Sequence, residues 1–221
     1  MVLTTFHIGS PVALGALLEK LPGPVVVLAN TRGLQRAGPE RVDLKVGEKD
    51  RIVAVKRAVD TLRAGGFVFT VADGDGAERL EANLLGRTIT LPRGVFAIAR
   101  LGNAPILPVA ARWRGRGVEI VTGDLIPPAA EQTMAEQLIS WLEGYLSKNP
   151  EPVPGSIAYM LGLSLADTVG ILAQRRKEKP VPDLAVVGTG DGPGRYDNYP
   201  AGREADGRHD ATRDLSADRL G

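Results

Sequence analysis

The chain contains no cysteine, which excludes disulfide bonds, thiolate nucleophiles and zinc sites built from cysteine, but does not fix the cellular compartment. It also lacks the G-x-S-x-G turn that presents a nucleophilic serine and the G-x-x-x-x-G-K-[ST] loop that binds nucleotide phosphates. No His, Asp and Glu residues occur at metal-ligand spacing. We therefore expect neither a metal site nor a serine hydrolase.

Excess charge and long apolar runs are missing as well. Lys and Arg number 27 against 26 Asp and Glu, and this balance argues against a nucleic-acid partner. No stretch of about 18 apolar residues runs without interruption, so we expect no membrane-spanning helix. The first residues, MVLTTFHIG, have no basic region and no long apolar region, so we expect no signal peptide.

The composition is otherwise that of a folded protein, with 43% hydrophobic residues in a chain of 221. We expect an α/β domain over residues 1–150 and an apolar helical segment over residues 151–179 that ends in the basic run RRKEK. This segment is either a last helix packed on the core or an interfacial helix that binds an anionic membrane. Residues 180–221 are rich in Gly, Asp and Arg, and we expect a disordered tail.

The stretch from residue 65 to residue 113 organises the domain. An apolar strand over 67–72 ends at Asp73 and is followed by a polar loop, the alternating strand GRTITL, a helix after Pro92-Arg93-Gly94 and the strand APILPVAARW. This order predicts a mostly parallel central sheet flanked by helices, with a ligand crevice at the carboxyl ends of the strands. Asp73 and Asp75 would lie at that edge. Further strands are expected over 1–8, 24–30, 42–46 and 117–127, and further helices over 12–21, 50–64 and 129–150.

The chain has only two histidines, and His209 falls in the expected tail. His7 ends the first strand, one short turn before a helix that Ser10 and Pro11 would open. The partial positive charge of that helix end disfavours imidazolium, so His7 is a candidate proton acceptor near neutral pH. The alternative is a structural histidine at a turn. We interpret Ser10 as a helix cap rather than a nucleophile.

Three segments together resemble the lysophospholipid acyltransferase superfamily: His7 with the helix behind it, GGFVFTVADG, and LLGRTITLPRGVFAIARLGNAPILPVAARW. The most similar branch is the bacterial lipid A biosynthesis (late) acyltransferases and the phosphatidylinositol mannoside acyltransferases. The resemblance covers residues 3–150 and implies a glycerol-3-phosphate acyltransferase-like fold. It also implies transfer of a fatty acyl group from an acyl thioester to a hydroxyl of a lysophospholipid or glycolipid, with His7 as general base.

The chain departs from this family at the catalytic acid. The family motif has an acidic residue five positions after the histidine, and that position is Val12. Valine can neither orient an imidazole nor stabilise its charged form. Asp73 is the expected substitute, with Asp75 as the other candidate, although an Asp-Gly pair is also common in turns.

The resemblance implies that arginines near the central strands, among them Arg87, Arg93 and Arg112, bind a phosphate of the donor or of the lipid head group, since the guanidinium suits phosphate. Gly94 would let the anion approach backbone N–H groups. Solvated surface arginines are the alternative. The expected donor is acyl-CoA or acyl carrier protein, with no other cofactor. The expected location is cytoplasmic, with peripheral attachment to the inner face of the cell membrane as the alternative.

Family members usually carry a longer segment, often a membrane anchor, before the histidine, whereas six residues precede His7 here. We therefore expect the first strand to lack a neighbour. A second functional hypothesis is a catalytically degenerate member, with Val12 in place of the acid, that binds a lipid or a partner protein. A third, an unrelated small α/β hydrolase, is disfavoured by the missing serine motif.

Overall fold

A mixed β-sheet lies at the centre of the unit Met1–Thr189 in this computed structural model. The structure describes residues 1–9, 11–29, 40–43, 48–74, 76, 78–114, 117–149, 155–178 and 186–187. The strands of this sheet are β1 (Val2–Thr5), β2 (Val25–Ala29), β3 (Glu40–Asp43), β4 (Phe67–Val71), β7 (Ile106–Arg114), β8 (Gly117–Thr122) and β9 (Val186–Val187). Their order within the described residues is β3-β2-β4-β1-β7-β8-β9.

The first five strands in this order, β3 to β7, are parallel, and β8 and β9 are antiparallel to their neighbours. This confirms the prediction of a mostly parallel sheet. The expectation that the first strand lacks a neighbour is wrong, because β1 pairs with β4 on one side and with β7 on the other. All four residues of β1 are buried, as expected of a strand covered on both faces.

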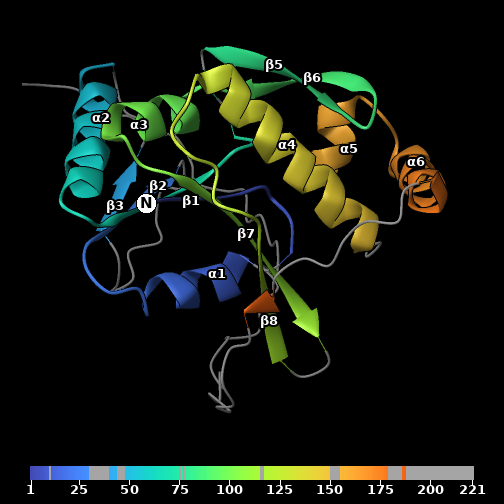
Figure 1. Cartoon of the computed structure of the whole chain (residues 1–221), viewed down its shortest axis with the longest axis horizontal. Coiled ribbons are helices and arrows are strands. Elements are labelled where there is room, and N and C mark those ends of the chain that lie inside the picture. The colour runs from blue at the N-terminus through green and yellow to red at the C-terminus, as the bar shows by residue number, and fades with distance from the viewer. Residues whose placement is uncertain are drawn as a thin grey trace, which may run out of the picture. The chain divides into compact units, whose positions relative to one another are not determined.

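Helices cover both faces of this sheet (Figure 1). They are α1 (Pro11–Leu18), α2 (Glu48–Arg63), α3 (Gly94–Gly102), α4 (Glu131–Lys148), α5 (Gly155–Leu161) and α6 (Leu165–Glu178). On one face Leu14 and Leu18 of α1 pack with Leu3 and Val109. The opposite face is covered by α2, α3 and α4. None of the helices within the described residues is long and apolar enough to cross a bilayer.

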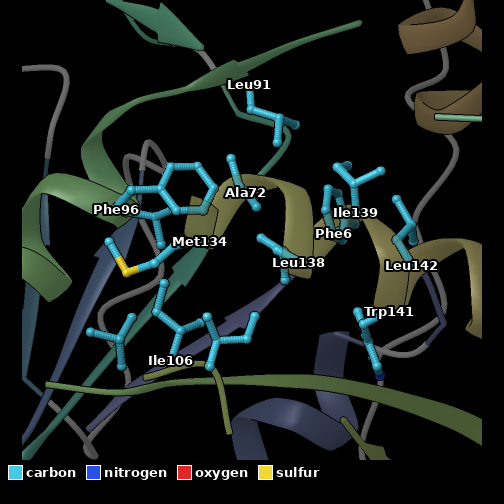
Figure 2. Close-up of a cluster of buried hydrophobic side chains, with 14 of the residues drawn as sticks. Phe6, Ala72, Leu91, Phe96, Ile106, Met134, Leu138, Ile139, Trp141 and Leu142 are labelled. Carbon is cyan, nitrogen blue, oxygen red and sulfur yellow. The ribbon is translucent and has the colours of Figure 1, made fainter. Parts of the chain in front are cut away.

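The larger core lies under α4. Met134, Leu138 and Leu142 of this helix are fully buried and pack in one cluster with Ile106 of β7 and with Phe6, which follows β1, as Figure 2 shows. The apolar residues at helical spacing on α4 are therefore its buried face. Burial of this face fixes α4 against the sheet.

The segment after Asp73 differs from the prediction. Residues 79–84, expected in a polar loop, form β5 (Arg79–Leu84), which pairs antiparallel with β6 (Arg87–Pro92) in a separate two-stranded sheet. GRTITL is thus a strand, but not one of the central sheet. Leu85 and Gly86 connect the two strands with φ of 56° and 80°, the positive angles of a tight hairpin turn. The alternating burial of both strands suits a hairpin that packs on α4 with one face.

The C-terminal apolar segment also differs, because it forms two helices rather than one. Gly162, with φ of 62°, ends α5, and Ser164 caps α6 through a hydrogen bond from the N–H of Asp167 (3.1 Å). Ile157 and Leu172 join the core, which confirms packing of this segment on the domain. Strand β9 lies inside the stretch expected to be disordered, and the rest of that stretch, His209 included, is outside the described residues.

Candidate active site

His7 sits in a tight turn at the carboxyl end of β1. The carbonyl of Phe6 accepts a hydrogen bond from the N–H of Ile8 (2.6 Å), which closes a three-residue turn centred on His7. Phe6 and Ile8 are buried, at 1% and 3% exposure, whereas the His7 side chain is 62% exposed. The two buried neighbours hold the turn while the imidazole stands at the edge of the sheet.

Asp73 lies beside His7, since it follows β4, the parallel neighbour of β1. Its carboxylate is fully buried and accepts hydrogen bonds from the backbone N–H of His7 at 3.1 and 2.9 Å. The Nδ1 atom of the His7 ring is 2.9 Å from Oδ1 of the same carboxylate. The predicted meeting of these two residues at one sheet edge is confirmed, although they are 66 positions apart in sequence.

This contact determines which ring nitrogen carries the proton. An ionised carboxylate can only accept hydrogen bonds, so Nδ1 of His7 is the donor. In the neutral ring the lone pair is then on Nε2. A carboxylate bound to one ring nitrogen is the way an orienting acid holds a general base.

Gly9 fixes the chain immediately after the turn. It forms a bridge with Ala111 of β7 and has φ of 69°. A Cβ at this position would lie 1.8 Å from the carbonyl oxygen of Ala111, so only glycine fits without a shift of the backbone. Nothing local in the sequence indicates this approach of β7.

The carboxylate that binds His7 comes from the end of β4 and not from the helix. Val12, which stands at the position of the family acid, is the second residue of α1. The contact of Asp73 with His7 is thus shown, and its role as a substitute acid stays a prediction. Asp75 and Ser10 lie outside the described residues, so their predicted roles stay predictions.

Arg93 lies at the start of α3 and is engaged by two carboxylates. It forms ion pairs with Glu78 and with Glu131, and Arg100 also pairs with Glu131 (2.9 Å). Glu131 is 9% exposed, and the hydrogen bond from Arg93 is the main cause that lowers its pKa. The same bond raises the pKa of Arg93. This group ties α3 to the first turn of α4.

Arg112 pairs in the same way with Glu119, its cross-strand partner on β8 (2.6 Å). Glu119 is 6% exposed, and the hydrogen bond from Arg112 is the main cause that lowers its pKa. Arg112 lies near the carboxyl end of β7, at the sheet edge that carries His7. A phosphate there would share the guanidinium with Glu119.

The other two predicted phosphate-binding positions are exposed. Arg87 begins β6 at the hairpin turn, and Gly94 begins α3 with open space where a Cβ would stand. A role of these positions in phosphate binding stays a prediction. We did not single out Glu119 and Glu131 from the sequence. The R-x-R-G-R-G-x-E hairpin pattern could have indicated the first, but nothing local indicates the second.

In the part of the chain that the structure describes, no three His, Asp or Glu side chains gather closely enough to hold a metal ion. The geometry therefore rests on one histidine–aspartate pair. No model of a known protein family matches the chain, and no curated protein matches it.

Proposed function

We propose that the protein transfers a fatty acyl group from the thioester of acyl-CoA or acyl carrier protein to a hydroxyl of a lysophospholipid or glycolipid. The observation that carries this proposal is the hydrogen bond between Nδ1 of His7 and the buried carboxylate of Asp73. The parallel sheet with this pair at its carboxyl edge supports it, since ligands of such sheets bind there. So does the resemblance of residues 3–150 to acyltransferases with the glycerol-3-phosphate acyltransferase-like fold.

In the proposed reaction, Nε2 of His7 removes the proton of the acceptor hydroxyl while its oxygen attacks the thioester carbonyl carbon. The new C–O bond forms, and the C–S bond then breaks with its electron pair leaving on sulfur. The thiolate takes the proton from Nε2, which restores the neutral ring. Asp73 remains bound to Nδ1 throughout, keeps the ring in place and stabilises the transient imidazolium.

Phosphate groups of the donor or acceptor would bind the cationic residues predicted for this role. Arg112 is the best placed, because it lies on the strand next to β1 at the same edge. Arg87, Arg93 and Gly94 complete the proposed set, with backbone N–H groups of α3 available at Gly94. The protein would act in the cytoplasm, at the inner face of the cell membrane.

The test is transfer of a labelled acyl chain from acyl-CoA, and in parallel from acyl carrier protein, to a panel of lyso-lipids. We expect His7→Ala to lower the rate by about 10²–10⁴-fold, the usual contribution of a general base. The variant His209→Ala, which removes the other histidine, should retain the wild-type rate. Equal rates for wild type and His7→Ala would remove His7 from the mechanism.

The second candidate function is binding without turnover, as a degenerate member of the fold. Two observations favour it: Val12 stands where the family has its acid, and Arg93 and Arg112 already pair with carboxylates. This candidate would be supported over the enzyme by two results together. Calorimetry would show binding of acyl-CoA or lyso-lipid, and wild type and His7→Ala would both transfer acyl groups only at the background rate.

A further inference from the structure

The hairpin of β7 and β8 extends beyond the sheet edge that carries His7. Gly9 bridges to Ala111, and β7 continues for three more residues to Arg114 before the chain turns into β8. At about 3.3 Å per residue, the end of β7 stands on the order of 10 Å past the level of Gly9. Figure 1 shows β7 and β8 running together toward the bottom of the view, away from α2, α3 and α4.

The end of this hairpin presents an unusual pair of side chains. Trp113 is 61% exposed and Arg114 is 74% exposed. Trp113 lies directly opposite Val118, which packs on the cluster under α1, so both stand on the α1 face of the sheet. The other tryptophan, Trp141, is buried. The exposure of Trp113 is therefore specific to this hairpin.

The hairpin is also basic. Its described residues include two arginines, Arg112 and Arg114, against one glutamate. That glutamate, Glu119, is buried and shared between Arg112 and Arg114, at 2.6 and 3.3 Å. The end of the hairpin thus offers an aromatic ring and a positive charge to whatever approaches this edge.

We propose that the hairpin end, Arg112–Arg114 of β7 with Gly117 and Val118 of β8, docks on a lipid surface that carries anionic phosphate head groups. The indole ring of Trp113 suits the boundary between head groups and acyl chains, because it is apolar with one polar N–H. The guanidinium of Arg114 suits the phosphates at the same depth. Tryptophan and arginine are also frequent in protein interfaces, and we favour the lipid surface because the proposed acceptor is itself a lipid.

This docking surface would bring the acceptor to the histidine, and to that extent the inference rests on the proposed function. β7 is the strand next to β1, so the hairpin and His7 share one edge. The head-group layer is on the order of 5–8 Å deep on each side of a bilayer. A hairpin end inserted through that layer would therefore hold head-group hydroxyls near the level of His7.

The experiment measures binding of the whole chain to vesicles of phosphatidylcholine alone and of phosphatidylcholine mixed with phosphatidylglycerol. We expect co-flotation with the mixed vesicles only, weakening as salt is added. Arg114→Gln should weaken partitioning about fivefold, the usual effect of one basic residue at an anionic surface. Arg51→Gln, which removes an exposed arginine of α2, is the matched control and should bind like wild type.

The indole is tested separately. Trp113→Ser should weaken binding about tenfold because it removes the large apolar surface. In Trp141→Phe, the fluorescence of the remaining Trp113 should shift to the blue on addition of mixed vesicles. If the Trp141→Phe variant folds poorly, the comparison of co-flotation between wild type and Trp113→Ser tests the same contact.

Exposed apolar side chains of α5 and α6 are the alternative surface for vesicle binding. Tyr159 of α5 is 87% exposed, and Leu165 and Val169 of α6 are 51% and 43% exposed. If Tyr159→Ser abolishes vesicle binding and Trp113→Ser does not, the proposal is overturned in favour of these helices. Absence of binding to either vesicle type also overturns it.

The catalytic proposal fails in a different way. His7→Ala should bind mixed vesicles like wild type, because His7 is not in the hairpin. Vesicle binding that depends on Trp113, in a protein with no acyl transfer, would retain the docking surface and reject the enzyme.

Discussion

Asp73 accepts hydrogen bonds from both the ring and the backbone of His7. The backbone contact extends the hydrogen bonding between β1 and β4 by one residue, since the N–H of Ala72 already donates to the carbonyl of Thr5 (2.7 Å). The ring contact selects the tautomer. One buried carboxylate therefore couples the position of the turn to the chemistry of the imidazole.

Replacing Asp73 with Asn should lower kcat for acyl transfer by about 10²–10⁴-fold with little change in KM. The amide is uncharged and replaces one acceptor oxygen with an NH2 donor, and an NH2 turned toward Nδ1 would favour the wrong tautomer of the ring. Steady-state kinetics with acyl-CoA measure the effect. Asp124→Asn, the same change at an exposed position after β8, should leave both constants unchanged. A wild-type kcat in the Asp73→Asn variant would show that the contact between Asp73 and His7 only shapes the turn.

Gly9 is the second residue on which the turn depends. Gly9→Ala should destabilise the fold by about 2–4 kcal/mol, because the new Cβ meets the carbonyl of Ala111 and alanine disfavours positive φ. Gly15→Ala in α1, where a Cβ meets nothing within 4 Å, should instead stabilise by about 0.5–1 kcal/mol. Urea unfolding gives both values. Equal effects of the two changes on stability would contradict the close approach of Gly9 to β7.

Among the elements, α3 and α4 are joined by charge as well as by packing. Glu131 in the first turn of α4 receives hydrogen bonds from Arg93 and Arg100, both associated with α3. A carboxylate in the first turn is also favoured by the helix dipole. The lowered pKa of Glu131 therefore links the docking of these two helices to pH.

Glu131→Gln should destabilise the protein at neutral pH, and the difference from wild type should shrink in acid. Because the folded-state pKa of Glu131 is lowered, its contribution is fully present above about pH 4.3, the ordinary value for glutamate. That contribution is lost as the pH falls through the lower, folded-state pKa. Urea midpoints across this range measure it. Glu136→Gln, an exposed position on the same helix, should change the urea midpoint at neutral pH by little.

For the unit Met1–Thr189 as a whole, one apolar layer joins the sheet, α3 and α4. Leu138 is fully buried at its centre (Figure 2). Leu138→Ala should cost about 2–5 kcal/mol of unfolding free energy, the usual range for a buried leucine. Leu125→Ala, at a site 57% exposed, should cost under about 0.5 kcal/mol. Thermal or urea unfolding of the two variants would show whether this layer is as important as its burial indicates.

Most elements could be predicted from the sequence because their signals are local. The apolar run over 67–72, the helical spacing over 50–64 and the stripe on the helix over 129–150 each report burial within a single segment. The β5–β6 hairpin was missed in part because Arg79–Leu84 follows the polar, glycine-containing run D-G-D-G, although its alternating residues are a strand signal. The break at Gly162 was missed because an isolated glycine is tolerated in a helix.

The alternation of strands and helices can be predicted from residue order alone, with His7 and Asp73 each at the end of a strand. The folded arrangement is needed to show that these strands are neighbours, that β1 is flanked on both sides, and that the acid beside the imidazole comes from β4 rather than from α1. This is because hydrophobic spacing reports the burial of one segment. A contact across 66 positions depends on strand order, which no single segment encodes.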